Sequence, residues 1–418
     1  MKPIGPIPPE FAAQPVLGIG GRNAAEWIEE AGTTPLFLYD FSMVASRIAG
    51  LRRALPARVD IHYAIKANPF APLVRAIAPL VDGLDVASAG ELRQALHVKP
   101  AAAISFAGPG KRDAELEDAI LAGATINIES EGEAARVLAI GDHTGVTPRL
   151  AVRVNPDFEL RGSGMRMGGR ASPFGIDADR AAALVGAIRS AGADWRGFHI
   201  FAGSQSLDTN AIVEAQAATL ALAARLADEA GAAPPSVNLG GGFGIPYFAG
   251  DTPVDVDRIG AALGDALASC ADALAGSSFV IELGRWIVGE AGVYLTRVID
   301  RKQSQGETFL VVDGGLHHQL AASGNFGTVV RRNYPIALAD RIGAPATETV
   351  TVVGCLCTPL DRLADKVLLP EAHPGDVIAI FLAGAYGLSA SPVDFLSHPV
   401  PVQILAGSPD NPNAIFTS

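Results

Sequence analysis

The chain has 418 residues, of which 49% are hydrophobic and 18% charged, and its 44 acidic and 32 basic side chains give a formal net charge of −12. This length corresponds to about two to three domains, and the hydrophobic content excludes a disordered tail. An acidic balance without a basic run argues against a nucleic-acid partner or an anionic membrane surface.

The N-terminal segment contains nothing typical of targeting or insertion. Its first twenty residues have no continuous apolar run, so we expect neither a secretory signal nor an anchor. Nowhere do about eighteen apolar residues follow one another, so we expect no membrane span. The run LFLYD at 36–40 predicts a strand, which we expect to join a second domain further along the chain.

From Val59 to about Leu283, short β-type runs alternate with Ala-rich stretches whose apolar residues recur at helical spacing. This alternation predicts a parallel sheet, because parallel neighbours need a crossover between them. About eight such units in one series favour a closed (β/α)8 TIM barrel over an open doubly wound sheet. The predicted strands are 59–66, 83–87, 103–107, 124–129, 149–155, 196–202, 236–240 and 279–283.

After Gly292 the pattern changes. Runs such as VYLTRVID, TFLVVDGG, TVTVVG and DVIAIFLAG follow one another with loops and little helix between them, which predicts a mostly antiparallel β domain. We therefore place the barrel at residues 41–280 and a β-rich domain at residues 1–40 and 281–418. The chain begins in the β domain, passes through the barrel and returns.

One of only six lysines occupies an unusual position. The scarcity of lysine itself reflects a coding bias towards arginine. In VDIHYAIKAN, however, Lys66 closes the first predicted barrel strand, with apolar residues on both sides. Barrel enzymes place their chemistry at this end of the strands. A lysine desolvated there has a lowered pKa and can form an imine, whereas the alternative is a strand-end lysine that reaches solvent.

Further candidates follow later strands at the same end of the barrel. They are Gly240, Gly241, Gly242 and Gly244 in SVNLGGGFGIPY, His199, Gly203, Ser204 and Gln205 in FHIFAGSQ, and Glu282 and Arg285 in IELGRW. Bare backbone N–H groups after a strand can approach a phosphate, although loop flexibility explains a glycine run equally well. The alternatives for the others are a core histidine and an ordinary salt bridge. An amine, a phosphate cradle, an imidazole and a carboxylate together are what pyridoxal phosphate needs.

The cysteines are odd in number, namely Cys270, Cys355 and Cys357, which is typical of a protein in a reducing cytoplasm. No His/Cys cluster with zinc spacing accompanies the Cys-x-Cys pair. The sequence therefore predicts a cytoplasmic protein without a metal site.

Six segments in order, YAIKAN, FHIFAGSQ, GGGFG, ELGRW, CTPLDRL and GAYGLSASP, make the chain resemble the fold-type III pyridoxal-phosphate decarboxylases of the diaminopimelate and ornithine decarboxylase family. The resemblance extends over nearly the whole chain from about residue 35, and implies an alanine racemase-like barrel with a C-terminal β domain. CTPLDRLADK and FLAGAYGLSASPVDFLSHP are most similar to the branch found in exosortase-associated gene clusters and in the butirosin pathway, where a carrier-protein-bound glutamyl group is decarboxylated.

This resemblance implies a role for each matching residue. Lys66 would hold the cofactor as an internal aldimine, His199 would stack on its pyridine ring, and Glu282 would pair with the ring nitrogen. Cys357 would reach the active site of the partner subunit in a head-to-tail homodimer. The residues implied to surround the phosphate are Ser204, Gly241, Gly242, Arg285 and Tyr386, and Asp85 is implied to lie near the cofactor.

Two departures from the family pattern concern the last barrel strand and the substrate. Leu283 replaces the proline of Glu-Pro-Gly-Arg, which we expect to change loop stiffness more than chemistry. After Cys357, the ornithine and diaminopimelate enzymes carry an acid that helps to bind the distal end of the substrate, and this chain has Thr358 and Pro359 instead. Neither can pair with a distal ammonium, which argues against a diamino-acid substrate.

We therefore predict pyridoxal-phosphate-dependent decarboxylation of an amino acid or a carrier-protein-bound aminoacyl group, giving an amine and carbon dioxide. Cys357 or Lys66 would return a proton to Cα. The nearest alternative is an amino-acid racemase on the same fold, which needs a second base, usually a tyrosine, where this chain presents Cys357. Another alternative is a non-catalytic protein that binds the cofactor, but such proteins are generally a barrel alone.

The far end of the substrate is the least defined part of this prediction. The missing acid after Cys357, together with Arg331 and Arg332, favours a far end that is anionic, neutral or a carrier thioester. The alternative is that both arginines lie on a solvated face.

Overall fold

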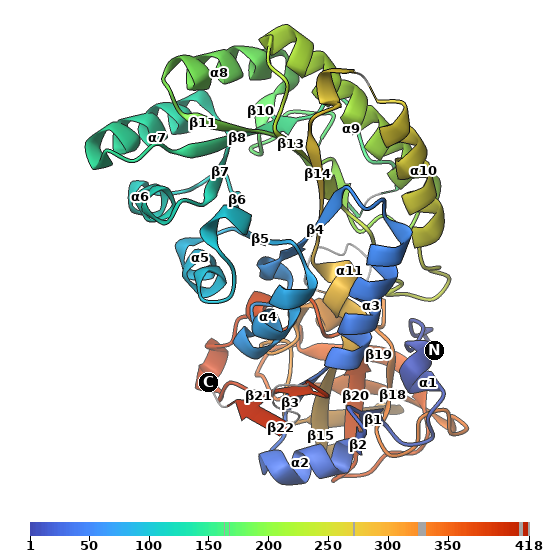
Figure 1. Cartoon of the computed structure of the whole chain (residues 1–418). Helices are drawn as coiled ribbons and strands as arrows, with labels where there is room; N and C mark the ends of the chain where they lie inside the picture. The colour runs from blue at the N-terminus through green and yellow to red at the C-terminus, as the bar shows by residue number, and fades with distance from the viewer. Residues whose placement is uncertain (163, 167, 271, 325–331, 409–412, 417–418) are drawn as a thin grey trace.

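The computed structural model describes all residues except 163, 167, 271, 325–331, 409–412 and 417–418. Within these residues the chain folds into a parallel barrel and a mostly antiparallel β domain, one beside the other (Figure 1). No helix in this described part is both long and apolar enough to cross a membrane.

Eight parallel strands close the barrel, as the alternating pattern predicts. Each pairs with the next in chain order, and the last pairs with the first. The strands are β4 (Val59–Ala64), β5 (Gly83–Val86), β6 (Ile104–Phe106), β7 (Thr125–Ile128), β8 (Arg149–Asn155), β11 (Asp194–Ile200), β13 (Ser236–Gly241) and β14 (Ser278–Leu283).

Helices cover the outside of the barrel (Figure 1). Side chains such as Ser88, Ser130 and Asp208 accept N–H groups of the first turn of the following helix, and left-handed glycines such as Gly123 and Gly231 end helices. The helices are α3 (Phe41–Ala54), α4 (Ala71–Ile77), α5 (Ala89–Leu96), α6 (Asp113–Ala122), α7 (Glu131–Thr144), α8 (Ala178–Ser190), α9 (Thr209–Ala230) and α10 (Val256–Ala268).

The β domain combines both ends of the chain. Its strands are β3 (Leu36–Asp40), β15 (Gly292–Ser304), β16 (Glu307–Val312), β17 (Ile336–Leu338), β18 (Glu348–Val353), β19 (Arg362–Leu369), β20 (Val377–Phe381), β21 (Val402–Ala406) and β22 (Asn413–Phe416). The strand predicted at 36–40 is β3, which pairs antiparallel with β15 and parallel with β21. In Figure 1 the blue N-terminal strand accordingly lies beside red C-terminal strands.

Shorter elements complete the chain: α1 (Pro9–Ala12), β1 (Gly18–Ile19), β2 (Arg22–Asn23), α2 (Ala24–Ala31), β9 (Met165–Arg166), β10 (Ile176–Asp177), β12 (Gly203–Ser204) and α11 (Arg285–Val288). The predicted domain boundary after residue 280 falls inside β14. We propose that the barrel extends to Leu283, because this strand pairs with β4 through that residue.

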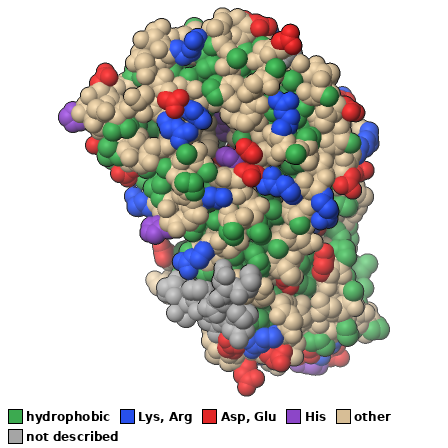
Figure 2. All heavy atoms as spheres, in the orientation of Figure 1, with side chains coloured by type: hydrophobic (Ala, Val, Ile, Leu, Met, Phe, Trp, Pro, Cys, Tyr) green, Lys and Arg blue, Asp and Glu red, His purple; other side chains and the backbone are tan. Residues whose placement is uncertain are grey.

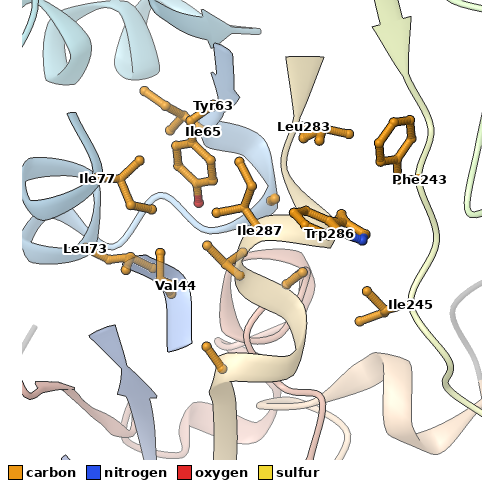
Figure 3. Packing of buried hydrophobic residues seen from close by; sticks show 14 of the residues in the cluster. Val44, Tyr63, Ile65, Leu73, Ile77, Phe243, Ile245, Leu283, Trp286 and Ile287 are labelled. Carbon is orange, nitrogen blue, oxygen red and sulfur yellow. The ribbon is translucent and has the colours of Figure 1, made fainter. Parts of the chain in front are cut away.

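A buried apolar layer supports the start and the end of the barrel. Tyr63 and Ile65 from the first strand segment meet Ile287 of α11, with Val44 of α3 and Leu73 of α4 close by (Figure 3). All five side chains are buried. The segment immediately after β4 therefore rests on a rigid platform, because close-packed interiors allow little displacement.

Candidate active site

Lys66 lies just beyond the first barrel strand. β4 ends at Ala64, and Ile65–Ala67 forms a short 3-10 turn that contains the lysine. The predicted strand was therefore two residues too long, although Lys66 does lie at the carboxyl end of the barrel. Its side chain is exposed in the single chain, so the expectation of desolvation by its surroundings is wrong there. Its Nζ lies 5.8 Å from the ring centroid of Phe201.

His199 and Glu282 meet inside the barrel mouth. His199 Nε2, on β11, lies 3.2 Å from Glu282 Oε2, on β14. The strand between them, β13, supplies Asn238, whose Nδ2 donates a hydrogen bond of 3.1 Å to the same oxygen. Both ring nitrogens of the buried His199 lack a hydrogen-bond partner of good geometry. A flat imidazole and a fixed carboxylate thus face the same interior.

The electrostatic surroundings keep Glu282 ionised. Burial alone raises the pKa of its carboxyl, but His199, Lys66 and Arg153 together outweigh burial and hold the pKa below the ordinary value of 4.5. Glu282 is therefore a buried carboxylate at neutral pH, suited to accept a hydrogen bond from a protonated ring nitrogen.

The glycine loop, residues 240–244 at the end of β13, has no room for a side chain at Gly241 or Gly242. A Cβ on Gly241 would lie 2.0 Å from the carbonyl oxygen of Glu282. Gly242 has a φ of +80°, and a Cβ there would lie 2.3 Å from the carbonyl oxygen of Gly203. Only glycine fits these two positions, so no side chain stands between this backbone and a phosphate at the barrel mouth.

The loop after β11 braces this glycine loop. Gln205 Nε2 donates a hydrogen bond of 2.7 Å to the carbonyl oxygen of Ile245, and its Oε1 accepts one of 3.2 Å from the N–H of the same residue. The N–H of Ser206 donates to the carbonyl oxygen of Gly242. Ser204 Oγ is buried without a hydrogen-bond partner. An unsatisfied buried hydroxyl beside a loop backbone without side chains is suited to an anion such as a phosphate.

Arg285 and Tyr386 bring the two domains together at this loop. The guanidinium of Arg285, on α11, lies 4.5 Å from the ring centroid of Tyr386 of the β domain. Its Nη1 donates a hydrogen bond of 2.9 Å to Tyr247 Oη. The N–H of Tyr386 donates to the carbonyl oxygen of Ala67, in the turn that carries Lys66. The β domain therefore contributes directly to the mouth of the barrel.

Asp85 lies on β5, beside β4. Its Oδ1 is 3.4 Å from His62 Nδ1, and its buried Oδ2 has no hydrogen-bond partner. Burial alone lowers the pKa of His62, but the charges of Asp85, Glu282 and Asp60 outweigh burial and raise the pKa. Asp85 is thus held next to the first barrel strand, where it pairs with Ala64, directly before the turn Ile65–Ala67 that carries Lys66.

Cys357 is not brought to these residues within one chain. It is exposed in the loop between β18 and β19. Among the described residues, no contact joins it to Lys66, His199 or Glu282.

Sequence reasoning missed three residues that hold the site. Asn238 fixes Glu282, Tyr247 fixes Arg285, and Arg153 lowers the pKa of Glu282 while its Nη1 donates a hydrogen bond of 2.6 Å to Glu129. For Asn238 and Arg153 the available signal was a polar residue inside an otherwise apolar strand, as in VNLG and LAVRVN, whereas Tyr247 lies in a loop and had no such signal.

These groups fit pyridoxal phosphate. Buried polar atoms of His199, Ser204 and Asp85 have no hydrogen-bond partner in the protein, as expected where a polar ligand binds. The glycine loop forms a cradle that a Cβ at Gly241 or Gly242 would fill. Lys66 adds the amine, and Glu282 adds the carboxylate. The donor set matches the cofactor that the sequence predicts.

Comparisons with known proteins identify the family of the chain. The model for the pyridoxal binding domain of pyridoxal-dependent decarboxylases matches residues 41–289. The L-glutamyl-[BtrI acyl-carrier protein] decarboxylase of Niallia circulans is 38% identical over 379 residues, which cover 89% of this chain and 88% of that protein. The 2-[(L-alanin-3-ylcarbamoyl)methyl]-2-hydroxybutanedioate decarboxylase of Staphylococcus aureus is 31% identical, over 87% of this chain and 92% of that protein.

Solved structures show the same fold. Diaminopimelate decarboxylase from M. jannaschii, in complex with L-lysine, superposes with a TM-score of 0.85 at 25% sequence identity, over 99% of this chain and 94% of that one. The Helicobacter pylori enzyme, also with L-lysine, gives a TM-score of 0.82 at 27% identity, over 94% and 95% of the two chains. The chain therefore belongs to the pyridoxal-dependent decarboxylases.

Proposed function

We propose that this pyridoxal-phosphate-dependent decarboxylase acts on a carrier-protein-bound glutamyl group or a closely similar aminoacyl group whose far end carries no ammonium. The observation that supports this substrate is the loop after Cys357, which offers Thr358 and Pro359 where an acid is needed to bind a distal ammonium. The similarity to a glutamyl-carrier decarboxylase points the same way.

The first acidic residue after Cys357 is Asp361, whose carboxylate already accepts hydrogen bonds from the backbone. Asp361 is buried, and its Oδ1 and Oδ2 accept hydrogen bonds of 2.7 and 2.9 Å from the N–H groups of Leu316 and Leu356. Withdrawing this carboxylate would leave two buried donors unsatisfied, which costs about 1–3 kcal/mol each. Asp361 therefore does not substitute for the missing acid.

The arginines proposed for an anionic far end contribute less to this argument. Arg332 is exposed, and its guanidinium lies 3.8 Å from the ring centroid of Phe248. Arg331 lies outside the described residues. The proposal accordingly depends on the loop after Cys357. The exposure of Arg332 agrees with the alternative that this arginine lies on a solvated face.

Each residue of the site has a chemical task. Pyridoxal phosphate, when bound, supplies an electron sink for the pair released as the carboxylate leaves. Lys66 would hold it covalently, and Glu282 would hold a proton at the ring nitrogen through its Oε2. Asn238 keeps that oxygen in place. Fixed charges of this kind stabilise the developing charge without reorganisation, which is the largest usual contribution to rate.

We further propose that the enzyme is a cytoplasmic homodimer in which Cys357 of one subunit enters the site of the other and protonates Cα of the product through Sγ. Support comes from the exposure of Cys357 together with nearby apolar side chains. Leu360, Phe395 and Leu396 are 56%, 44% and 50% exposed. Apolar surface of this kind is typical of an interface. The three free cysteines agree with a reducing compartment.

The test measures carbon dioxide release from the holoenzyme with free glutamate, lysine, ornithine, meso-diaminopimelate and a glutamyl-loaded acyl-carrier protein. We expect the loaded carrier to exceed every dibasic amino acid in kcat/KM by at least about 100-fold. A preference for any dibasic substrate would overturn the proposal. A preference for free glutamate would overturn the proposal that the substrate is bound to a carrier protein. It would leave the proposal that the far end of the substrate carries no ammonium.

A matched variant sharpens this test. Thr358→Glu places an acid directly after Cys357, so we expect activity on ornithine or lysine to rise relative to the loaded carrier. Chiral chromatography of each amino acid, run alongside the gas measurement, separates decarboxylation from racemisation. Racemisation without carbon dioxide would favour the racemase.

A further inference from the structure

Three loops of the β domain bring two histidines and a cysteine together. His317 follows β16, Cys355 follows β18, and His398 precedes β21. One ligand atom from each side chain lies within 4.8 Å of the others. The sequence showed no zinc spacing because these residues are about forty positions apart along the chain.

The distances suit a tetrahedral metal. Cys355 Sγ lies 3.7 Å from His398 Nε2. A zinc ion about 2.3 Å from sulfur and 2.1 Å from nitrogen at a tetrahedral angle requires a separation of about 3.6 Å. The rings of His317 and His398 lie with their centroids 5.0 Å apart, and their ligand atoms lie within 4.8 Å of each other and of the sulfur.

His317 is buried, with a relative exposure of 0%, yet neither ring nitrogen has a hydrogen-bond partner. Its neighbour His318, equally buried, places Nδ1 3.2 Å from Tyr294 Oη. Buried polar groups without partners are rare and require an explanation. A ligand seated between His317, Cys355 and His398 supplies one.

A buried carboxylate positions two of the three loops. Asp361 accepts the N–H groups of Leu316 and Leu356, each adjacent to one of the proposed ligands. Gly354 permits this arrangement, because a Cβ there would lie 2.2 Å from Asp361 Oδ2. Hydrogen bonds that orient the ligand-bearing segments are typical of built metal sites.

We propose that His317, Cys355 and His398 bind a thiophilic divalent cation of the Zn²⁺ class, with the fourth coordination position open to solvent or to a ligand. Binding replaces the proton of the Cys355 thiol, which is released to solvent. The ion would join the loop that carries Cys357 to two other loops of the β domain. This site goes beyond the decarboxylase activity and revises the expectation of a protein without metal.

The test uses the untagged, full-length holoenzyme. After dialysis against Zn²⁺ and then against metal-free buffer, we expect about one Zn²⁺ per chain by elemental analysis. Zinc X-ray absorption should show a single sulfur at about 2.3 Å and nitrogen or oxygen at about 2.0–2.1 Å. A coordination shell without sulfur, or with two sulfurs, would overturn the assignment.

Variants separate this site from adventitious binding. Cys355→Ser and His398→Ala should each weaken Zn²⁺ binding at least about tenfold in a competition titration, with unchanged circular dichroism. Cys270→Ser and His373→Gln, which alter a cysteine and an exposed histidine elsewhere, should bind as the native chain does. Equal retention of Zn²⁺ by the native chain and Cys355→Ser would reject the site, and because activity is not measured, this failure is distinct from failure of the proposed substrate.

Discussion

The backbone N–H of Tyr386 donates a hydrogen bond to the carbonyl oxygen of Ala67, one residue after Lys66. A second bond, of 2.9 Å, joins Asn68 Nδ2 to the carbonyl oxygen of Gly384. The turn that carries the lysine is thus held by the β domain as much as by the barrel. Changes in either domain should therefore affect the cofactor site.

The glycine loop gives a first prediction. Gly242→Ala should weaken the binding of pyridoxal phosphate at least about tenfold, because its Cβ would meet the carbonyl oxygen of Gly203 at 2.3 Å. Gly250→Ala is the matched control, since Gly250 also has a positive φ but has nothing within 4 Å of a Cβ. Fluorescence titration of the cofactor measures both, and equal affinities for the two variants would contradict the cradle.

Lys66 and Cys357 give a second prediction, which tests the shared site. Lys66→Ala should lose both activity and the visible absorbance of bound cofactor, and Cys357→Ala should lose activity. After the two variants are unfolded and refolded together, about a quarter of native activity should return, because half of randomly formed dimers would each contain one intact site. Heterodimers demonstrated by native mass spectrometry but without activity would exclude the shared arrangement.

The third prediction concerns acid stability. The pKa of Glu282 is lowered in the folded chain, so below its ordinary value of 4.5 the unfolded chain takes up a proton that the folded chain does not. The free energy of unfolding contributed by Glu282 is therefore complete above that pH and is lost as pH falls towards the folded pKa. Between about pH 6 and pH 3, Glu282→Gln should lose less stability than the native apoenzyme in urea unfolding.

The exposed Glu29 provides the control for this measurement. Glu29→Gln should follow the native pH dependence. If the native chain and Glu282→Gln lost the same free energy of unfolding as the pH falls, the ionisation of Glu282 would not account for the loss of stability in acid.

A fourth prediction concerns the junction between α3 and the segment after α11. Arg47 forms a salt bridge with the buried Glu290, and its guanidinium lies 4.9 Å from the ring centroid of Trp286. Burial lowers the pKa of Arg47 to about 10, against the opposing charge of Glu10. Arg47→Met should reduce the free energy of unfolding by about 3 kcal/mol, because it leaves a buried carboxylate without its cation.

Chemical denaturation checks this value. Arg53→Met, an exposed position on the same helix, should change stability little. Arg47→Met with Glu290→Met should recover part of the loss, since no unpaired charge then remains. Equal stability of Arg47→Met and the native chain would show that the salt bridge contributes nothing.

The barrel could be predicted from the sequence because its signal is local: each strand and helix has its own periodicity, and the order of units defines the fold. The grouping of Lys66, His199 and Glu282 followed, because parallel strands end on one side. The exposure of Lys66 was not predictable, since it depends on neighbours from distant segments. The cluster of His317, Cys355 and His398 was also not predictable from the sequence, because only the tertiary structure brings these three loops together.

The central place of β3 in the β domain has a consequence for synthesis. Tyr39 on this strand donates a hydrogen bond to Gln403, 364 positions later. During translation β3 leaves the ribosome before any of the barrel, whereas its parallel partner β21 is made only after the whole barrel. The barrel can close before β3 has this partner, so the surface that holds the turn with Lys66 in place is completed only after β21 has been made.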